Sequence, residues 1–208
     1  MIGFFGGSFD PVHLGHLNSA QQLKKQLNLT QLFLMPCHTP VHKKCLTFST
    51  QQRLEMLEIA IENFPELSID TGEITQPVAS YTIDSLKRIA KQYPQQSFGL
   101  IIGMDSFNQL SSWKNYQTFW QYCHLIVVGR PGQEKIADTY NFTQVKNKAA
   151  LNNQASGLVY FSQTKLYDIS SSDIRGILFN DASSGKIPAQ SNLAELLPIG
   201  VINYLKKL

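Results

Sequence analysis

The sequence contains few cysteines, little net charge and no long hydrophobic run. Three cysteines among 208 residues are too few, and odd in number, to form the disulfide framework of a small secreted protein. No apolar stretch approaches the roughly 18 residues of a membrane-spanning helix, and the first residues lack the basic start and cleavage site of a signal peptide. The net charge of +3 is too small to indicate nucleic-acid binding. We therefore expect a cytoplasmic protein without nucleic-acid or membrane partners, acting as a monomer or homodimer.

Short apolar segments alternate with segments of helical periodicity along most of the chain. Strands are expected at residues 2–5, 31–35, 67–70, 97–103, 123–129 and 157–162. Helices are expected at residues 14–28, 49–63, 82–93, 105–122 with a break near 111–112, 171–180, and from 198 onward. This order predicts a Rossmann-like, doubly wound parallel sheet with helices on both faces. We expect one domain over residues 1–208, with the helical part from about residue 171 packed onto it, and loops at 133–156 and 180–192.

The segment GGSFDPVHLGH, residues 6–16, connects the first predicted strand to the first predicted helix. In a parallel sheet this position lies at the carboxyl end of a strand, where such folds bind ligands. Gly6 and Gly7 allow a phosphate to approach backbone N–H groups, and the helix N-terminus adds partial positive charge. His13 and His16 are three residues apart, so both rings can contact one anion. Neither a P-loop lysine nor a G-x-G-x-x-G pattern follows, which excludes those two phosphate-binding motifs.

Two segments also allow other interpretations. His13 and His16 with nearby Asp10 could bind zinc, although catalytic zinc prefers a third ligand at a characteristic spacing. They could equally be surface histidines on an ordinary capped helix. After the second predicted strand, a further cluster could suggest a zinc site, although its spacing matches no common structural zinc pattern: Cys37, His38, His42 and Cys45.

Residues 8–16 resemble the T/S-F-D-P-x-H-x-G-H signature of the nucleotidyltransferases related to class I aminoacyl-tRNA synthetases. Within that superfamily the chain is most similar to the bacterial nicotinate-nucleotide adenylyltransferases, along nearly its whole length. Residues 36–44 resemble this family's P-x-x-x-P-P-H-K loop, with Val41 where a second proline is usual. Lys43 and Arg53, on the following helix, could face a nucleotide phosphate or remain solvated surface cations.

Three further features resemble the part of the family's site that holds the pyridine nucleotide. Residues 79–82 (ASYT) match the S-Y-T motif, with Ser80 or Thr82 as the expected helix cap. Residues 101–107 match I-x-G-x-D-S/A, in which Gly103 permits close approach and Asp105 can accept a hydrogen bond from a ribose hydroxyl. Trp113 offers a planar indole for stacking on an electron-poor pyridine ring. A helix cap at Asp105 and a core position for Trp113 are the structural alternatives.

A second helix N-terminus carries the other phosphate-binding motif. Residues 168–175 (DISSSDIR) resemble the family's I-S-S-T-x-I-R motif, with Ser172 in place of threonine. Ser170, Ser171 and the N–H groups of this turn can bind phosphate oxygens. Arg175 follows about one turn later and can bind the same phosphates through two N–H donors. The resemblance also places Arg130 near the nucleotide.

The resemblance implies transfer of AMP from ATP to nicotinate mononucleotide, with Mg²⁺ bound mainly through the ATP phosphates. Predicted ATP-binding residues are Gly6, Gly7, Ser8, Phe9, His13, His16, Gly103, Asp105, Arg130, Ile169, Ser170, Ser171 and Arg175. Predicted mononucleotide-binding residues are Ser8, Lys43, Arg53, Tyr81, Thr82, Trp113 and Lys114. We predict catalytic roles for His13, His16 and Arg175, with His16 stabilising the transition state. Alternatives are a nicotinamide mononucleotide or phosphopantetheine acceptor, a cytidylyltransferase, or a non-catalytic nucleotide-binding module. Residues 133–156, Cys37, Cys45 and Cys123 receive no role.

Overall fold

A parallel sheet of seven strands forms the centre of the molecule. The computed structural model describes residues 1–38, 46–76, 80–129, 138–164, 169–180 and 191–208. The strands are β1 (Ile2–Gly7), β2 (Gln31–Pro36), β3 (Ser68–Ile69), β4 (Phe98–Gly103), β5 (His124–Val128), β6 (Thr143–Val145) and β7 (Leu158–Ser162). They lie in the order β3-β2-β1-β4-β5-β7-β6, and every neighbouring pair is parallel. This arrangement confirms the predicted doubly wound fold.

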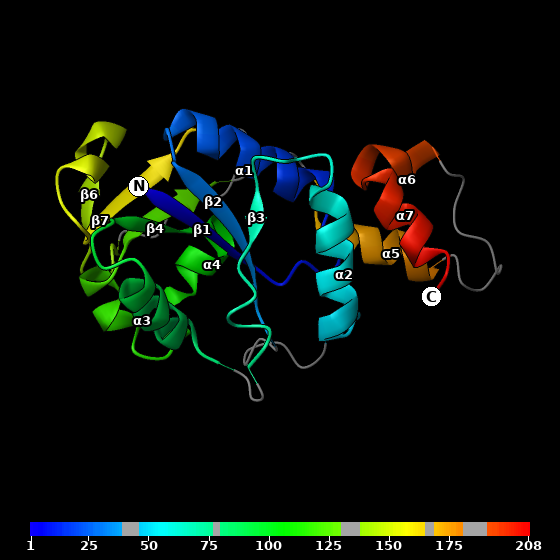
Figure 1. The fold of residues 1–208 in the computed structure, drawn as a ribbon, viewed down its shortest axis with the longest axis horizontal. Helices are drawn as coiled ribbons and strands as arrows, with labels where there is room; N and C mark the ends of the chain where they lie inside the picture. The colour runs from blue at the N-terminus through cyan, green and yellow to red at the C-terminus, as the bar shows by residue number, and fades with distance from the viewer. Residues whose placement is uncertain (39–45, 77–79, 130–137, 165–168, 181–190) are drawn as a thin grey trace.

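Helices cover both faces of the sheet (Figure 1). The α-helices are α1 (Leu14–Gln26), α2 (Thr50–Ile61), α3 (Thr82–Gln92), α4 (Met104–Asn108), α5 (Ser171–Asn180), α6 (Ser191–Leu196) and α7 (Ile199–Leu205). The 3-10 helices are η1 (Leu110–Ser112), η2 (Tyr116–Gln121) and η3 (Lys148–Asn152). Figure 1 shows α5, α6 and α7 grouped beyond α2, at the end of the molecule opposite β6 and β7. In the described part of the chain, no helix is long and apolar enough to span a membrane.

Two hydrophobic clusters lie on opposite faces of the sheet. Successive strand residues point to alternate faces, so Phe5 joins one cluster and Phe4 joins the other. The first cluster includes buried side chains of α1, α2, α5, α6 and α7, and the second includes those of α3, α4, η1 and η2. The C-terminal helices therefore share a core with the first half of the chain.

The strand order reverses between β1 and β4. The chain passes from β1 through α1 to β2 on one side, and reaches β4 on the other side of β1 only after α3. Because α1 and α3 cover opposite faces, the carboxyl ends of β1 and β4 form the switch point at which open α/β sheets bind ligands. Gly7 ends β1 and Gly103 ends β4 at this edge.

Local sequence explains the start of α2, whereas the start of α3 differs from the prediction. Ser49 caps α2 in a reciprocal capping box with Gln52, as expected for serine followed three residues later by glutamine. The predicted Ser80 or Thr82 cap of α3 is wrong, because Tyr81 is the N-cap residue and makes no side-chain capping bond. That helix begins where its apolar face meets the core rather than where a hydroxyl is available.

Three segments between the main elements also differ from the prediction. The expected helix at 105–122 is divided into α4, η1 and η2, although the break near residues 111–112 is present. The expected loop at 133–156 contains β6 and η3, and the expected loop at 180–192 ends in α6. Strand β6 has three residues, of which Thr143 and Gln144 are exposed, so it carries almost no hydrophobic signal.

Candidate active site

The loop after β1 is shaped by the aromatic ring of Phe9. This ring is fully buried and lies edge-on against His16, with the two ring centroids 4.9 Å apart. A Cβ atom at Gly7 would lie 3.0 Å from Phe9 Cζ, so a larger residue there would push the ring by a few tenths of an ångström. Phe9 itself has a left-handed backbone with φ of 47°. The prediction that Phe9 binds ATP is therefore wrong for its side chain, which is buried and packs against His16.

The rings of His13 and His16 stack at the N-terminus of α1. Their centroids are 3.7 Å apart and the ring planes are inclined by 25°. His13 is the N-cap residue, and its Nδ1 accepts a hydrogen bond from the backbone N–H of His16 at 3.3 Å. A neutral imidazole that accepts through Nδ1 carries its proton on Nε2. No acidic residue lies in the first turn of α1, so its partial positive charge is not neutralised there.

The N-terminus of α5 packs directly against the same loop, as the two motifs predicted. Ser171 Oγ donates a 3.0 Å hydrogen bond to the carbonyl of Pro11. Arg175 Nη1 donates a 2.7 Å hydrogen bond to the carbonyl of Asp10. A Cβ atom at Gly15 would lie 2.9 Å from His13 Nδ1 and 3.2 Å from Ile169 Cβ. Glycine at position 15 therefore allows the two helix N-termini to meet.

In this structure the polar side chains of residues 169–175, in the second motif, hydrogen-bond to other protein groups. Ser170 Oγ donates a 2.5 Å hydrogen bond to Asp173 Oδ2 and accepts the N–H of that residue at 3.1 Å. Arg175 Nη2 donates to Ser172 Oγ at 3.1 Å, and the Arg175 side chain is 28% exposed. Both Ser170 and Ser171 are partly exposed. Phosphate contacts by these residues stay a prediction.

Asp10 connects three segments of the site. Its carboxylate accepts hydrogen bonds from the backbone N–H of Thr47 at 3.0 Å and of Phe48 at 2.9 Å. It also lies 3.7 Å from Arg175 Nη1. The described residues contain no group of three side chains placed to hold a metal ion, so the zinc interpretation of Asp10, His13 and His16 has no support there. Of the other proposed zinc cluster, His42 and Cys45 lie outside the described residues.

The predicted contact of Arg53 with a substrate phosphate is wrong. The residue is fully buried in α2, and its guanidinium donates to the carbonyls of Ser8 at 2.8 Å and His38 at 2.5 Å. Arg53 therefore holds the loop after β1 to the turn after β2. The sequence shows a cation at the right place along the chain but cannot show that two backbone carbonyls occupy it.

On the side of α3, residues predicted to hold the pyridine nucleotide lie close together. Lys114 Nζ lies 4.0 Å from the ring centroid of Tyr81, which links the start of α3 to the segment after η1. Trp113 is half-buried and packs edge-on against Phe119, with centroids 6.3 Å apart. The core interpretation and the stacking interpretation of Trp113 are thus compatible.

Gly103, Asp105 and Thr82 occupy the same edge of the sheet. Asp105 is exposed in the first turn of α4, while Gly103 is its N-cap residue, so the cap interpretation of Asp105 is wrong. A Cβ atom at Gly103 would meet nothing within 4 Å, which leaves space above the end of β4. Thr82 is partly exposed at the first position of α3. Lys43 and Arg130 lie outside the described residues.

Sequence reasoning missed a buried acidic residue close to α3, and it gave no role to Cys123, which is buried in the core. Glu73 is 6% exposed, and burial raises the pKa of its carboxyl group above the ordinary value. An acidic residue inside a turn-forming segment gave no signal of burial. Burial also raises the pKa of the Cys123 thiol to about 12, which makes it unreactive. Cys37 is partly exposed, and its backbone N–H donates a 3.0 Å hydrogen bond to the carbonyl of Gly7.

Comparisons with known proteins agree with this geometry. Residues 4–177 match the family model described as cytidylyltransferase-like. A probable nicotinate-nucleotide adenylyltransferase of Vesicomyosocius okutanii is 50% identical over 208 residues, which are 100% of this chain and 95% of the relative. A protein of the same name from Pseudoalteromonas atlantica is 40% identical over 185 residues, 86% of this chain and 84% of that one.

Solved structures show the same fold. The nicotinic acid mononucleotide adenylyltransferase of Plasmodium falciparum, in complex with NaAD, superposes with a TM-score of 0.73 at 20% sequence identity. The superposition covers 99% of this chain and 94% of the other. From the family model and the sequence identity over most of its length, the chain belongs to the nicotinate-nucleotide adenylyltransferase family of cytidylyltransferase-like proteins.

Proposed function

We propose that this chain transfers the adenylyl group of ATP to nicotinate mononucleotide, giving deamido-NAD and pyrophosphate. The observation that carries the proposal is the meeting of two helix N-termini, α1 and α5, around the stacked pair of His13 and His16. The meeting point lies at the reversal of strand order, where a doubly wound sheet binds nucleotides. Relatives of similar length that are named probable nicotinate-nucleotide adenylyltransferases support the choice of acceptor.

The reaction needs no general base. The 5′-phosphate of the mononucleotide is already an anion at neutral pH, and one of its oxygens forms a new bond to the α-phosphorus of ATP. The bond between that phosphorus and the bridging oxygen to the β-phosphorus breaks, and its electron pair leaves on pyrophosphate. Catalysis then consists of in-line positioning and stabilisation of charge on the leaving group.

His13 and His16 would perform that stabilisation. The Nδ1 bond fixes His13 with Nε2–H as its donor, and the buried Phe9 ring limits rotation of His16. Donors held before the reaction stabilise charge in the transition state without having to reorganise. The N-termini of α1 and α5 add backbone N–H groups to the same region. Arg175 keeps the two motifs together through Asp10.

The donor set of the site suits phosphate rather than a metal cage. It consists of imidazoles, a guanidinium and backbone N–H groups, whereas Mg²⁺ requires oxygen ligands. The Asp10 carboxylate is engaged by two N–H groups and Arg175. Mg²⁺ therefore fits as an ion carried by the ATP phosphates and water, where it would neutralise charge on the pyrophosphate.

The acceptor would bind on the side of α3 and η1. The half-buried Trp113 ring would stack on the pyridine. Lys114, placed over Tyr81, adds positive charge beside it. These features favour an acceptor with a carboxylate, which nicotinate carries and nicotinamide lacks.

Pyrophosphate release tests this function. The purified protein is mixed with ATP, Mg²⁺ and either nicotinate or nicotinamide mononucleotide at equal concentration. We expect release with the nicotinate form and a kcat/KM at least about 10-fold lower with the nicotinamide form, because only the first pairs with the positive groups. Equal rates would contradict the acceptor preference. Release with neither mononucleotide would overturn the proposed reaction.

A further inference from the structure

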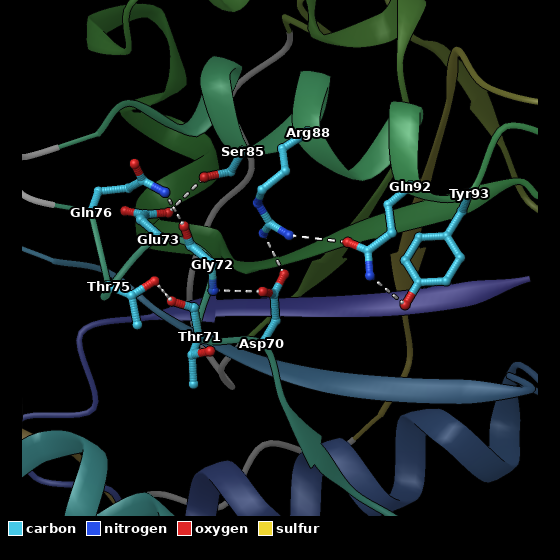
Figure 2. Close-up of polar contacts among 10 residues, drawn as sticks. All are labelled: Asp70, Thr71, Gly72, Glu73, Thr75, Gln76, Ser85, Arg88, Gln92 and Tyr93. Atoms are coloured by element: carbon cyan, nitrogen blue, oxygen red, sulfur yellow. Dashed lines mark hydrogen bonds and ion pairs between the residues drawn. The ribbon is translucent and has the colours of Figure 1, made fainter.

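Figure 2 shows a polar cluster in which the segment after β3 contacts α3 in two places. Asp70 pairs with Arg88 in the middle of α3, with Oδ2 and Nη2 2.5 Å apart. Glu73 instead points toward Ser85, near the start of α3, and accepts its hydroxyl at 3.0 Å. The proposed mechanism uses neither contact, but only the second lies beside residues predicted to bind the pyridine nucleotide.

Glu73 also receives a backbone group from a different part of the chain. The N–H of His38, in the turn after β2, hydrogen-bonds the Glu73 carboxylate. This carboxylate is buried, and desolvation raises its pKa despite the two hydrogen bonds. Burying an acidic group is unfavourable unless its partners fix it well, so the two donors are the groups that hold Glu73.

The peptide groups of His38 are held from two directions. Glu73 accepts its N–H, while Arg53 donates to its carbonyl and also to the carbonyl of Ser8. The preceding N–H, of Cys37, donates to the carbonyl of Gly7. Arg53 therefore connects the turn after β2 to the segment 6–16, which we call the phosphate loop. Glu73 connects the same turn to α3.

On the other side, Ser85 belongs to the first turn of α3. Its N–H donates to the carbonyl of Tyr81 at 3.3 Å, which joins Ser85 to the N-cap residue of the helix. Tyr81 in turn carries the Lys114 ammonium over its ring. Glu73 thus connects, through two hydrogen bonds, the turn after β2 and the start of α3.

We propose that Glu73 is a positioning residue, which sets the mononucleotide-binding start of α3 relative to the turn after β2 and, through Arg53, to the phosphate loop. The inference rests on the proposed function, because it assigns the start of α3 to the mononucleotide. Glu73 touches neither substrate in this role. Its loss should weaken binding of the acceptor while the contacts of ATP with α1 and α5 remain.

Steady-state kinetics of four variants test this role. Glu73→Met removes both acceptors in a side chain of similar length, and we expect an about 10-fold higher KM for nicotinate mononucleotide with the KM for ATP within about 2-fold. Glu73→Gln should restore most of the affinity, because its amide oxygen accepts the His38 N–H and its amide nitrogen donates to Ser85 Oγ. Ser85→Ala removes one link and should raise the same KM by about 3-fold.

Asp70→Asn is the matched control, since it removes the charge of the ion pair between Asp70 and Arg88 in the same segment and leaves Glu73 in place. It should lower the melting temperature without changing either KM. The proposal is overturned if Glu73→Met raises both KM values equally or neither, or if Asp70→Asn reproduces its effect. Should Glu73→Met fail to fold, an unchanged acceptor KM in Ser85→Ala overturns it. An inactive wild-type protein would instead refute the proposed function, and this inference with it.

Discussion

The two histidines of the phosphate loop differ in their surroundings, and this difference predicts different roles. His13 is 3% exposed and caps α1, whereas His16 is partly exposed beside the ring of Phe9. His13 therefore contributes to the shape of the loop as well as to charge stabilisation. The more accessible His16 is the better candidate for contact with the reacting phosphates.

We expect His16→Ala to lower kcat by about 100-fold or more while the KM for ATP changes by less than about 3-fold, because the lost donor acts mainly in the transition state. Steady-state kinetics at saturating acceptor measure both constants. A melting curve close to that of the wild type would show that the fold is retained. Turnover near that of the wild type would contradict the role of His16.

Gly15 predicts a substitution that separates activity from stability. Alanine is favoured over glycine inside a helix by about 1 kcal/mol, but its Cβ would lie 2.9 Å from His13 Nδ1 and 3.2 Å from Ile169 Cβ. Gly15→Ala should therefore displace the His13 ring and lower kcat by about 10-fold or more, with a small change in melting temperature. In the control Gly129→Ala, the new Cβ meets only Met104 Cε at 3.7 Å, and turnover should be retained. Equal activity of both variants would show that the His13 position is not critical.

At the level of elements, the contact between α5 and the loop after β1 is centred on Asp10. Asp10→Ala removes the acceptor of the Thr47 and Phe48 N–H groups and should lower the free energy of unfolding by about 2–4 kcal/mol. Arg175→Met removes a partly exposed partner and should cost about 1 kcal/mol or less. Urea denaturation measures both values. A larger loss in Arg175→Met would mean that the contacts of Arg175, and not the N–H groups of Thr47 and Phe48, fix Asp10.

The elements that could be predicted from the sequence are those with a strong local signal. The central strands are continuous apolar runs, and the motifs at 6–16 and 168–175 begin helices in the structure as expected. The pairing of β6 with β7 and the burial of Arg53 depend on partners far along the chain. A sequence pattern indicates that a cation is present, but only the packed fold shows whether it faces ligand or backbone. Glu73 escaped prediction for the same reason.

At the scale of the whole molecule, the proposed active site and the buried, titratable His124 lie at opposite edges of the sheet. The proposed site lies at the carboxyl ends of β1 and β4, whereas His124 begins β5 at the amino end and is fully buried. His124 Nε2 lies 3.0 Å from the carbonyl oxygen of Gln154, and its Nδ1 accepts the N–H of Leu158 at 3.3 Å. The neutral ring satisfies both contacts, while a protonated ring cannot accept from Leu158.

Burial lowers the pKa of His124 below its ordinary value of 6.5, so the native state disfavours the protonated ring that the unfolded chain accepts. Its contribution to stability is complete above pH 6.5 and is lost as the pH falls below that value through the native pKa. The raised pKa of Glu73 has the opposite effect, since its ionisation destabilises the native state as the pH rises above 4.5. The pH dependence of the wild type alone therefore combines both groups.

His124→Asn separates them, because asparagine can still accept from Leu158 and does not titrate, while Glu73 is common to both proteins. We expect the wild type to be more stable than the variant at pH 8, and this advantage to shrink on lowering the pH to 5, as measured by urea denaturation. The kcat of the variant at pH 8 should equal that of the wild type, because the substitution lies at the other edge of the sheet. An advantage that stays constant or grows at low pH would mean that His124 does not take up a proton on unfolding in this range.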